Sequence, residues 1–274
     1  MSAGPPRSWS AALPPSAEPV PVVPGFRLDE LLGWGASGAV WRAERLADGS
    51  AVALKVARSA ADQGTVREAT ALSTIRHPGV VRVLGHARTD DGRPVGVLEL
   101  VGGESLAARL GRDAMPLGQG LAIARGIAAA LVAAHAAGVV HGDLKPANVM
   151  LRPEGGVVLL DFGAAAVAGG ASHGIGGTPA YLAPEQVDGV TASAASDVFS
   201  FGVILYELLV GVRPFVGEGV QQLLFQIAYA EAPDLAVVAP RVPAGARAAC
   251  ARCLAKDPHA RPTARELAGA LAAG

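Results

Sequence analysis

The sequence is poor in cysteine and in charge. Its 274 residues include only two cysteines, too few for a secreted fold held together by disulfides. Charged residues make up 17% and the formal net charge is −1, so no broad basic face for nucleic acid is expected. Apolar residues make up 51%, which excludes a chain that is disordered throughout.

Long hydrophobic runs are also absent, although the mean hydropathy is high at +0.36. The longest weakly polar stretch, residues 127–140, is mostly alanine and contains His135. It is shorter than the roughly 20 residues that a bilayer helix needs. Residues 203–212 are interrupted by Glu207, and the N-terminus shows no signal-peptide pattern. We therefore expect no membrane segment in this chain and a cytoplasmic protein.

Proline is concentrated at the N-terminus. Residues 1–24 contain seven prolines among Ser, Ala and Gly. Proline lacks a backbone N–H and does not fit a helix interior, so the composition predicts a disordered, extended tail. The pattern changes near residue 25, where folded structure is expected to begin.

The remaining chain divides into a strand-rich part and a helical part. Alternating apolar residues predict five strands and one helix, at 26–32, 39–44, 51–56, 66–75 (the helix), 80–88 and 94–100. Beyond residue 103 the spacing predicts mainly helices, at 117–135, 198–210, 220–230, 244–254 and 262–272. Short apolar strands at 149–151 and 157–160 interrupt them. The chain is therefore expected to be α+β.

Two features near the N-terminus suit phosphate binding. Gly33, Gly35 and Gly38 lie between the first two predicted strands, and such a loop lets backbone amides approach phosphates. A plain glycine-rich turn would have the same spacing. Lys55 lies in an apolar strand, where a buried ammonium needs a partner, and Glu68 on the following helix could supply one.

Two further segments carry polar groups next to apolar strands. His141-Gly142-Asp143-Leu144-Lys145-Pro146-Ala147-Asn148 precedes the strand at 149–151, and its polar residues suit a loop that displays several groups at one site. Asp161-Phe162-Gly163 follows the strand at 157–160. A carboxylate at that position is a good candidate metal ligand.

Together and in this order, these segments resemble the catalytic domain of protein kinases. Further landmarks agree: Ala183-Pro184-Glu185, Asp197 at the start of an apolar helix, and Arg261 near the end. The resemblance covers about residues 26–273. The motifs look like those of the bacterial branch of serine/threonine kinases. It implies a bilobal fold in one domain (25–273), with a small antiparallel β-sheet N-lobe containing one helix (about 25–98), a hinge (about 99–102) and a larger, mainly helical C-lobe (about 103–273).

The resemblance implies transfer of the ATP γ-phosphoryl group to Ser or Thr hydroxyls of proteins. It implies that the loop with Gly33, Gly35 and Gly38 covers the ATP phosphates. Lys55 would hold the α- and β-phosphates and pair with Glu68. The oligomeric state, the activating signal and the physiological substrate are not implied.

The resemblance also assigns the reacting centre. Asn148 and Asp161 would hold Mg²⁺, with Mn²⁺ as an alternative. Asp143 would act as catalytic base, and Lys145 would steady the transferred group. Thr178 would hydrogen-bond near them.

For the adenine, the resemblance implies a site between the lobes. The roof would be Val40 and Ala53, the floor Met150, and the hinge contacts Glu99 and Val101. Leu98 falls at the gatekeeper position, and Glu104 could reach the ribose. The apolar members of this set are equally ordinary core residues.

One departure concerns activation. Gly142 stands where the family usually has an Arg that pairs with a phosphorylated residue, and Ser172 is the only hydroxyl in residues 163–177. We therefore hypothesise activity that does not depend on phosphorylation of this segment. Two alternatives remain: a nucleotide-binding pseudokinase, and a small-molecule phosphotransferase of the aminoglycoside type, which shares His-Gly-Asp.

Cys250 and Cys253 have the spacing of a redox or zinc pair. A single such pair without further ligands is a weak signal. Because the pair lies in a predicted helix, we expect structural packing, with Cys253 facing inward. His141 is expected to pack beside the catalytic loop.

Overall fold

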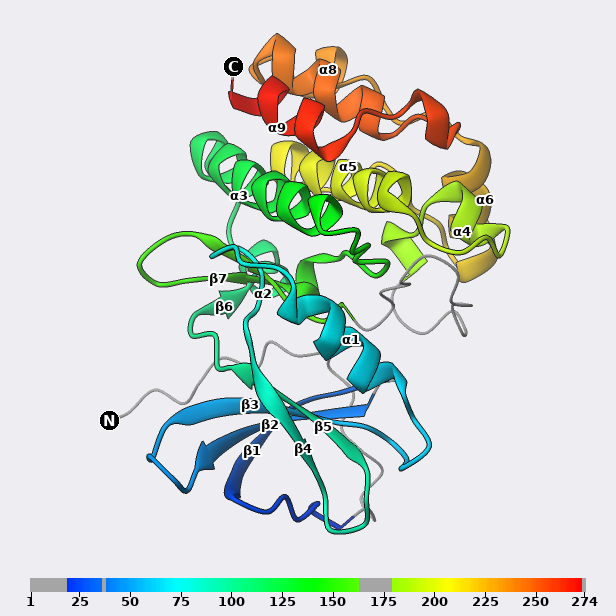
Figure 1. Ribbon diagram of the computed structural model, residues 1–274. Coiled ribbons are helices and arrows are strands. Elements are labelled where there is room, and N and C mark those ends of the chain that lie inside the picture. The colour runs from blue at the N-terminus through cyan, green and yellow to red at the C-terminus, as the bar shows by residue number, and fades with distance from the viewer. Residues whose placement is uncertain (1–18, 36–37, 163–178, 273–274) are drawn as a thin grey trace.

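A five-stranded antiparallel sheet forms the N-terminal part of the protein (Figure 1). The computed structural model describes residues 19–35, 38–162 and 179–272. The strand order is β1-β2-β3-β5-β4. The helix α1 packs against β4 and β5. Their bounds are β1 Phe26–Gly35, β2 Gly38–Arg45, β3 Ala51–Val56, α1 Gly64–Ser73, β4 Val83–Arg88 and β5 Pro94–Glu99.

Alternating side chains give this sheet two different apolar faces. Val40 of β2 and Ala53 of β3 belong to the main core, which continues into the helical part. Ala43 of β2 and Leu54 of β3 point the other way and belong to a second cluster on the opposite face. Val23 is 2% exposed and packs into this second cluster. The residues just before β1 therefore cover the outer face of the sheet.

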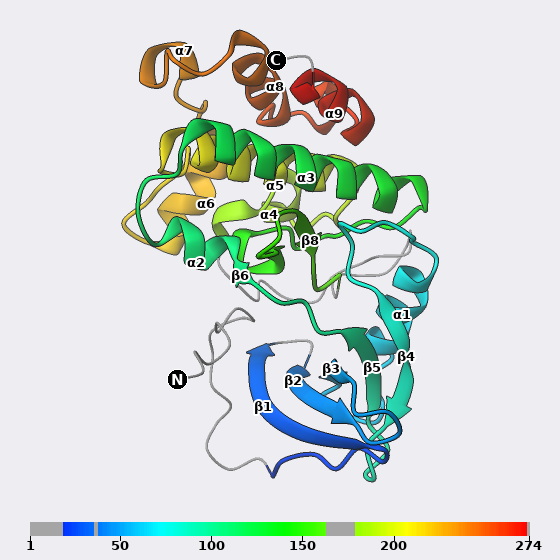
Figure 2. The ribbon, with the colours of Figure 1, turned by 90° about the vertical axis from the view of Figure 1, so that its left-hand side faces the viewer.

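Helices dominate the rest of the chain (Figure 2). They are α2 Leu106–Leu110, α3 Leu117–Ala136, α4 Pro184–Val187, α5 Ala194–Val210, α6 Val220–Tyr229, α7 Leu235–Val238, α8 Ala244–Cys253 and α9 Ala264–Ala272. A small antiparallel sheet with the order β6-β7-β8 lies beside them, formed by Glu104–Ser105, Val149–Leu151 and Val157–Leu159. This arrangement confirms the expected α+β, kinase-like fold.

The central helix α5 organises the helical part. Its first turn is capped by Ser193, whose hydroxyl accepts from the N–H of Ser196, and it ends at Gly211 in the left-handed region (φ 86°). It packs against α3 and α8. A Cβ at Gly202 would lie 2.7 Å from the Cβ of Cys253, so the glycine permits close contact between α5 and α8. Both cysteines are buried, which agrees with a packing role.

The apolar helix α3 is longer than the stretch considered in the sequence. Its 20 residues are enough by length and composition to cross a membrane. Nine of them are buried, however, and the helix packs against α5, α9 and β8. The composition of α3 is therefore that of a core helix.

Several predicted bounds were wrong by a few residues. The predicted strand 80–88 begins at Val83, because Val80 forms an isolated parallel bridge with Leu159 instead. Helix α5 begins at Ala194, four residues before the predicted start at 198, because Ser193 caps the helix at that point. The short elements β6, α2, α4 and α7 were not predicted, because segments of two to five residues carry no clear periodicity.

Candidate active site

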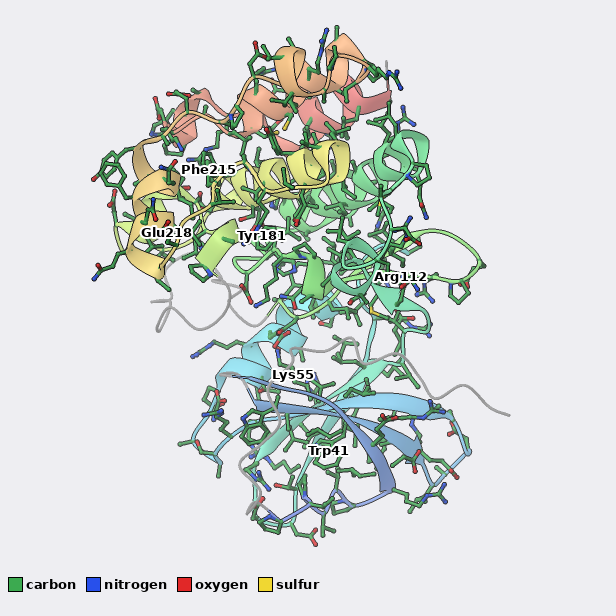
Figure 3. All side chains as sticks on the ribbon, turned by 180° about the vertical axis from the view of Figure 1, so that it is seen from behind. Trp41, Lys55, Arg112, Tyr181, Phe215 and Glu218 are labelled. Atoms are coloured by element: carbon green, nitrogen blue, oxygen red, sulfur yellow. The ribbon has the colours of Figure 1, made fainter. Side chains whose placement is uncertain are left out.

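Lys55 lies where the five-stranded sheet faces the helical part (Figure 3). It forms an ion cluster with Glu68 and Asp161. Lys55 is only 2% exposed. Its Nζ donates to Glu68 Oε2 and, over 2.6 Å, to Asp161 Oδ1. The strand β3, the helix α1 and the segment after β8 thus meet at one ammonium. The partner predicted for Lys55 on the helix is confirmed, whereas its second partner, Asp161, was not foreseen.

The charges of this cluster influence one another. Burial alone would lower the pKa of Lys55, but Asp161 and Glu68 outweigh it and raise that pKa above its ordinary value. Burial raises the pKa of Glu68. Burial would also raise the pKa of Asp161, but Lys55 outweighs it and holds the pKa below its usual value. Lys55 is therefore charged at neutral pH, and Asp161 is the more readily ionised of the two carboxyl groups.

The backbone at Asp161 is unusual. Its φ is 53°, the only positive value at a non-glycine residue in the described part of the chain. Asp tolerates this region better than most residues, and such backbone strain tends to occur at functional sites. Phe162, fully buried, packs against the ring of His141 with a centroid separation of 4.5 Å. The residue that follows Asp161 is therefore anchored in the core, while the Asp161 carboxylate bonds to Lys55.

The loop before β7 brings three polar side chains together. Lys145 Nζ donates to Asp143 Oδ2 over 2.6 Å. Asn148 Nδ2 donates to the Asp143 carbonyl (2.9 Å) and lies 3.4 Å from its carboxylate. The Asp143 side chain is 35% exposed, so it remains accessible to another molecule. The expected convergence of Asp143, Lys145 and Asn148 is confirmed.

Asp197 at the start of α5 anchors this loop. It is 1% exposed, and its carboxylate accepts the backbone N–H groups of His141 and Gly142, each over 2.8 Å. His135 Nε2 lies 2.8 Å from the same carboxylate. His141 is fully buried and accepts the N–H of Asp143 at Nδ1 (3.3 Å). The predicted packing role of His141 is confirmed, while the contact of His135 was missed.

The glycine-rich segment closes the β1–β2 hairpin. Gly33 pairs with Val40, and Gly35 pairs with Gly38. Gly38 has φ +125°, and a Cβ there would lie 2.1 Å from the Val56 carbonyl oxygen. The close approach of β2 to β3 therefore requires glycine at this position.

The predicted apolar residues also gather in one place. Five of them, at most 8% exposed, belong to the main core: Val40, Ala53, Leu98, Val101 and Met150. The carboxylate of Glu99 instead accepts the N–H of Arg82 (3.1 Å) and lies 3.4 Å from Arg152 Nη2. The carboxylate of Glu104 accepts from Arg112 over 2.6 Å. Both carboxylates therefore already bond to protein groups: that of Glu99 to a backbone N–H and an arginine, and that of Glu104 to an arginine.

Asp161 and Asn148 fit a magnesium ion by their donor chemistry. Leu160 N–H donates to the Asn148 carbonyl over 2.8 Å, which places the two segments side by side. Asn148 donates through its Nδ2 to Asp143, and no donor among the described residues bonds to its Oδ1. Mg²⁺ is usually held by one or two protein oxygens together with phosphates and water. Within the described ranges no cluster of three His, Cys, Asp or Glu side chains could hold a metal, so an all-protein cage is not found there.

Some predicted residues lie outside the described part of the chain. They are Thr178, Ser172 and the rest of the segment 163–178, together with the tail 1–18. The expectations for these residues stay predictions.

Comparison with known proteins identifies the family of this chain. A family model described as "Protein kinase domain" matches residues 26–270. This chain belongs to the protein kinase family. The recognition from motifs is therefore confirmed.

Individual kinases are similar over most of this chain. PkaA, a serine/threonine-protein kinase of Streptomyces coelicolor, is 37% identical over 92% of this chain and 50% of that protein. The kinase pkn3 of Myxococcus xanthus is 34% identical over 88% and 48%. The DNA damage-responsive kinase RqkA of Deinococcus radiodurans is 37% identical over 89% and 39%. The chain thus spans half or less of the length of these relatives.

Proposed function

We propose that this protein is a serine/threonine protein kinase. The observation that carries the proposal is a pair of polar clusters: Lys55 with Glu68 and Asp161, and Asp143 with Lys145 and Asn148. A backbone hydrogen bond from Leu160 N–H to the Asn148 carbonyl joins the segments that carry them. Phosphoryl transfer depends on positioning and on neutralising charge, and these clusters supply both. The relatives' names as serine/threonine-protein kinases support the substrate class.

In this proposal the first cluster binds the nucleotide. Lys55, kept charged by its carboxylate partners, binds the α- and β-phosphates of ATP. Gly33, Gly35 and Gly38 allow the hairpin backbone to lie against the phosphates. Asp161 and Asn148 hold Mg²⁺, or Mn²⁺ in its place, which neutralises charge on the phosphates when bound.

The second cluster acts on the acceptor. The Asp143 carboxylate orients a Ser or Thr hydroxyl and accepts its proton. The hydroxyl oxygen forms a bond to the γ-phosphorus, the bond from that phosphorus to the β–γ bridging oxygen breaks, and ADP leaves. Lys145, 2.6 Å from Asp143 Oδ2, stabilises the charge on the transferred group. Thr178 is assigned to the same centre from the sequence.

The adenine is placed between the sheet and the helical part. By the resemblance, Val40 and Ala53 form its roof and Met150 its floor, and all three lie in the one core that runs from the sheet into the helical part. Val101 and Glu99 contribute through their backbone in the hinge, because the Glu99 carboxylate is already engaged. The domain we propose covers residues 25–273, with lobes at about 25–98 and 103–273.

Activity independent of phosphorylation in the segment 163–177 is part of the proposal. Gly142 has no side chain with which to bind a phosphate. The test is Ser172→Ala with turnover as readout. We expect activity close to that of the unchanged protein, and a near-complete loss would refute this part.

The experiment for the main proposal uses labelled ATP, Mg²⁺ and a generic protein substrate. We expect label on Ser and Thr hydroxyls, and its loss in Asp143→Asn with nucleotide binding retained. ATP binding without transfer in the unchanged protein would point to a pseudokinase, and label on an aminoglycoside would point to a small-molecule phosphotransferase.

A further inference from the structure

Gly142, immediately before Asp143, is a point of backbone freedom in the catalytic loop. Its φ is 75°, in the left-handed region. Glycine adopts this region without strain, but it also adopts many others and so loses the most entropy when it is fixed. Contacts from outside the loop must therefore hold the two peptide units that flank Gly142.

The first of these peptide units is held by α5. Its N–H, on Gly142, donates to the Asp197 carboxylate over 2.8 Å, and the N–H of the preceding unit, on His141, donates to the same carboxylate over 2.8 Å. The second unit, which joins Gly142 to Asp143, is held differently. Its N–H donates to His141 Nδ1 over 3.3 Å, a long contact within the loop itself. Its carbonyl accepts from Gln186 Nε2 over 3.2 Å. Gln186 is thus the described residue outside the loop that bonds to this unit.

The direction of the Gln186 amide is fixed by a second bond. Gln186 Oε1 accepts the N–H of Ala183 over 3.0 Å at the start of α4. Because that N–H needs an acceptor, the NH₂ end of the amide must face Gly142. Helix α4 is itself anchored, since Glu185 forms a two-pronged pair with Arg261 (2.7 and 2.8 Å). The Gln186 side chain therefore links a rigid helix to the residue before the catalytic base.

We propose that Gln186 is a positioning residue for Asp143, an inference that rests on the proposed kinase function. It fixes the Gly142–Asp143 peptide through a neutral hydrogen bond from α4. This hydrogen bond needs neither a phosphate nor a charged partner, because the amide donor and the carbonyl acceptor are both uncharged groups. It can therefore form at any phosphorylation state of the protein. The hydrogen bond from α4 thus restricts the backbone at Gly142, where glycine alone would leave it free to adopt other conformations.

Two substitutions separate this role from simple packing. Gln186→Glu is close in shape and keeps an acceptor for Ala183 N–H, but its second oxygen faces the Gly142 carbonyl and cannot donate at neutral pH. Gln186→Leu removes both bonds. The matched control is Gln119→Leu, an exposed residue near the N-terminal end of α3, about 24 Å along that helix from His135.

We expect both Gln186 variants to lower kcat about tenfold, the effect of losing one ordinary hydrogen bond in the reactive geometry. The KM for ATP should not change, because the nucleotide cluster is separate. Amide hydrogen exchange at Gly142 and Asp143 should speed up in both variants. Gln119→Leu should change none of these quantities. Adding Gly142→Asn, which tolerates positive φ while restricting the backbone, should restore part of kcat in Gln186→Glu.

The outcomes distinguish the two proposals. If the unchanged protein transfers no phosphate, the proposed function fails, and the exchange rates at Gly142 and Asp143 still test the link. If the unchanged protein is active and Gln186→Glu matches it in kcat and in exchange, the inference is wrong. A loss of kcat that accompanies an equal loss of thermal stability, without faster exchange at Gly142 and Asp143, would also overturn it.

Discussion

The ammonium of Lys55 lies 2.6 Å from the carboxylate of Asp161, although 106 residues separate them in the chain. The same ammonium binds Glu68, so one cation serves two carboxylates in a buried place. This arrangement ties the sheet, the helix α1 and the segment after β8 to a single charge. Removal of that charge should therefore leave two carboxylates without their cation and affect both the site and the packing around it.

Lys55→Met tests this relationship directly. We expect a loss of kcat of at least about 100-fold, because a preorganised charge at the phosphates is lost. The pKa of Glu68 should rise further, since its cationic partner is gone. Turnover and nucleotide binding are the measurements, with Arg27→Met, which removes an exposed ion pair, as the control. Full activity in Lys55→Met would contradict the proposed site.

Two glycines of the β1–β2 hairpin should respond differently to alanine. At Gly38 a Cβ would lie 2.1 Å from a backbone oxygen and φ is +125°, whereas at Gly35 nothing lies within 4 Å. Gly38→Ala should cost about 2 kcal/mol or more, which corresponds to roughly 4–8 °C in Tm. Gly35→Ala should unfold near the original Tm. Equal Tm values for the two variants would show that the close approach is not rigid.

The pair of Glu185 and Arg261 should make stability depend on acid. Burial alone would raise the pKa of Glu185, but the hydrogen bonds from Arg261 outweigh it and hold the pKa below 4.5. A carboxyl group with a lowered folded-state pKa stabilises the fold above its unfolded pKa, and this contribution is lost as pH falls through the folded value.

Glu185→Gln should therefore lower the free energy of unfolding by about 3 kcal/mol at pH 7. The difference between variant and unchanged protein should shrink as pH falls below 4.5. Urea unfolding at pH 7 and pH 3.5 measures both values. If the unfolding free energies of Glu185→Gln and the unchanged protein differ by the same amount at pH 7 and pH 3.5, the ionised pair is not the source of the stability.

Asp197→Asn should weaken the catalytic loop. The carboxylate accepts two backbone N–H groups and contacts His135, whereas an amide has one oxygen and turns an NH₂ group toward a donor. We expect a loss of about 3 kcal/mol in stability together with a lower kcat. Asp188→Asn, at an exposed helix end nearby, should leave both unchanged. Retained kcat in Asp197→Asn would mean that the loop does not depend on this anchor.

Local patterns predicted much of this molecule. The five strands and the long helices follow from apolar spacing, because the period of two or 3.6 residues depends on neighbours in the chain. The partner of Lys55 on α1 could also be predicted, since a buried ammonium requires a carboxylate and Glu68 lies 13 residues away. Gly33, Gly38, Asp143 and Asn148 stood out by their order along the chain.

The choice of contacts across the fold was decided only by the tertiary structure. Nothing in the sequence indicates that Gln186 bonds to Gly142, 44 residues earlier, or that His135 meets Asp197. Glu99 shows the same limit, because its carboxylate accepts the N–H of Arg82, 17 residues earlier. A polar side chain bonds to whichever donor or acceptor the packing brings within about 3 Å, and packing depends on every element at once. The sequence by itself determined which groups are available at the site, and the tertiary structure decided which of them hold one another.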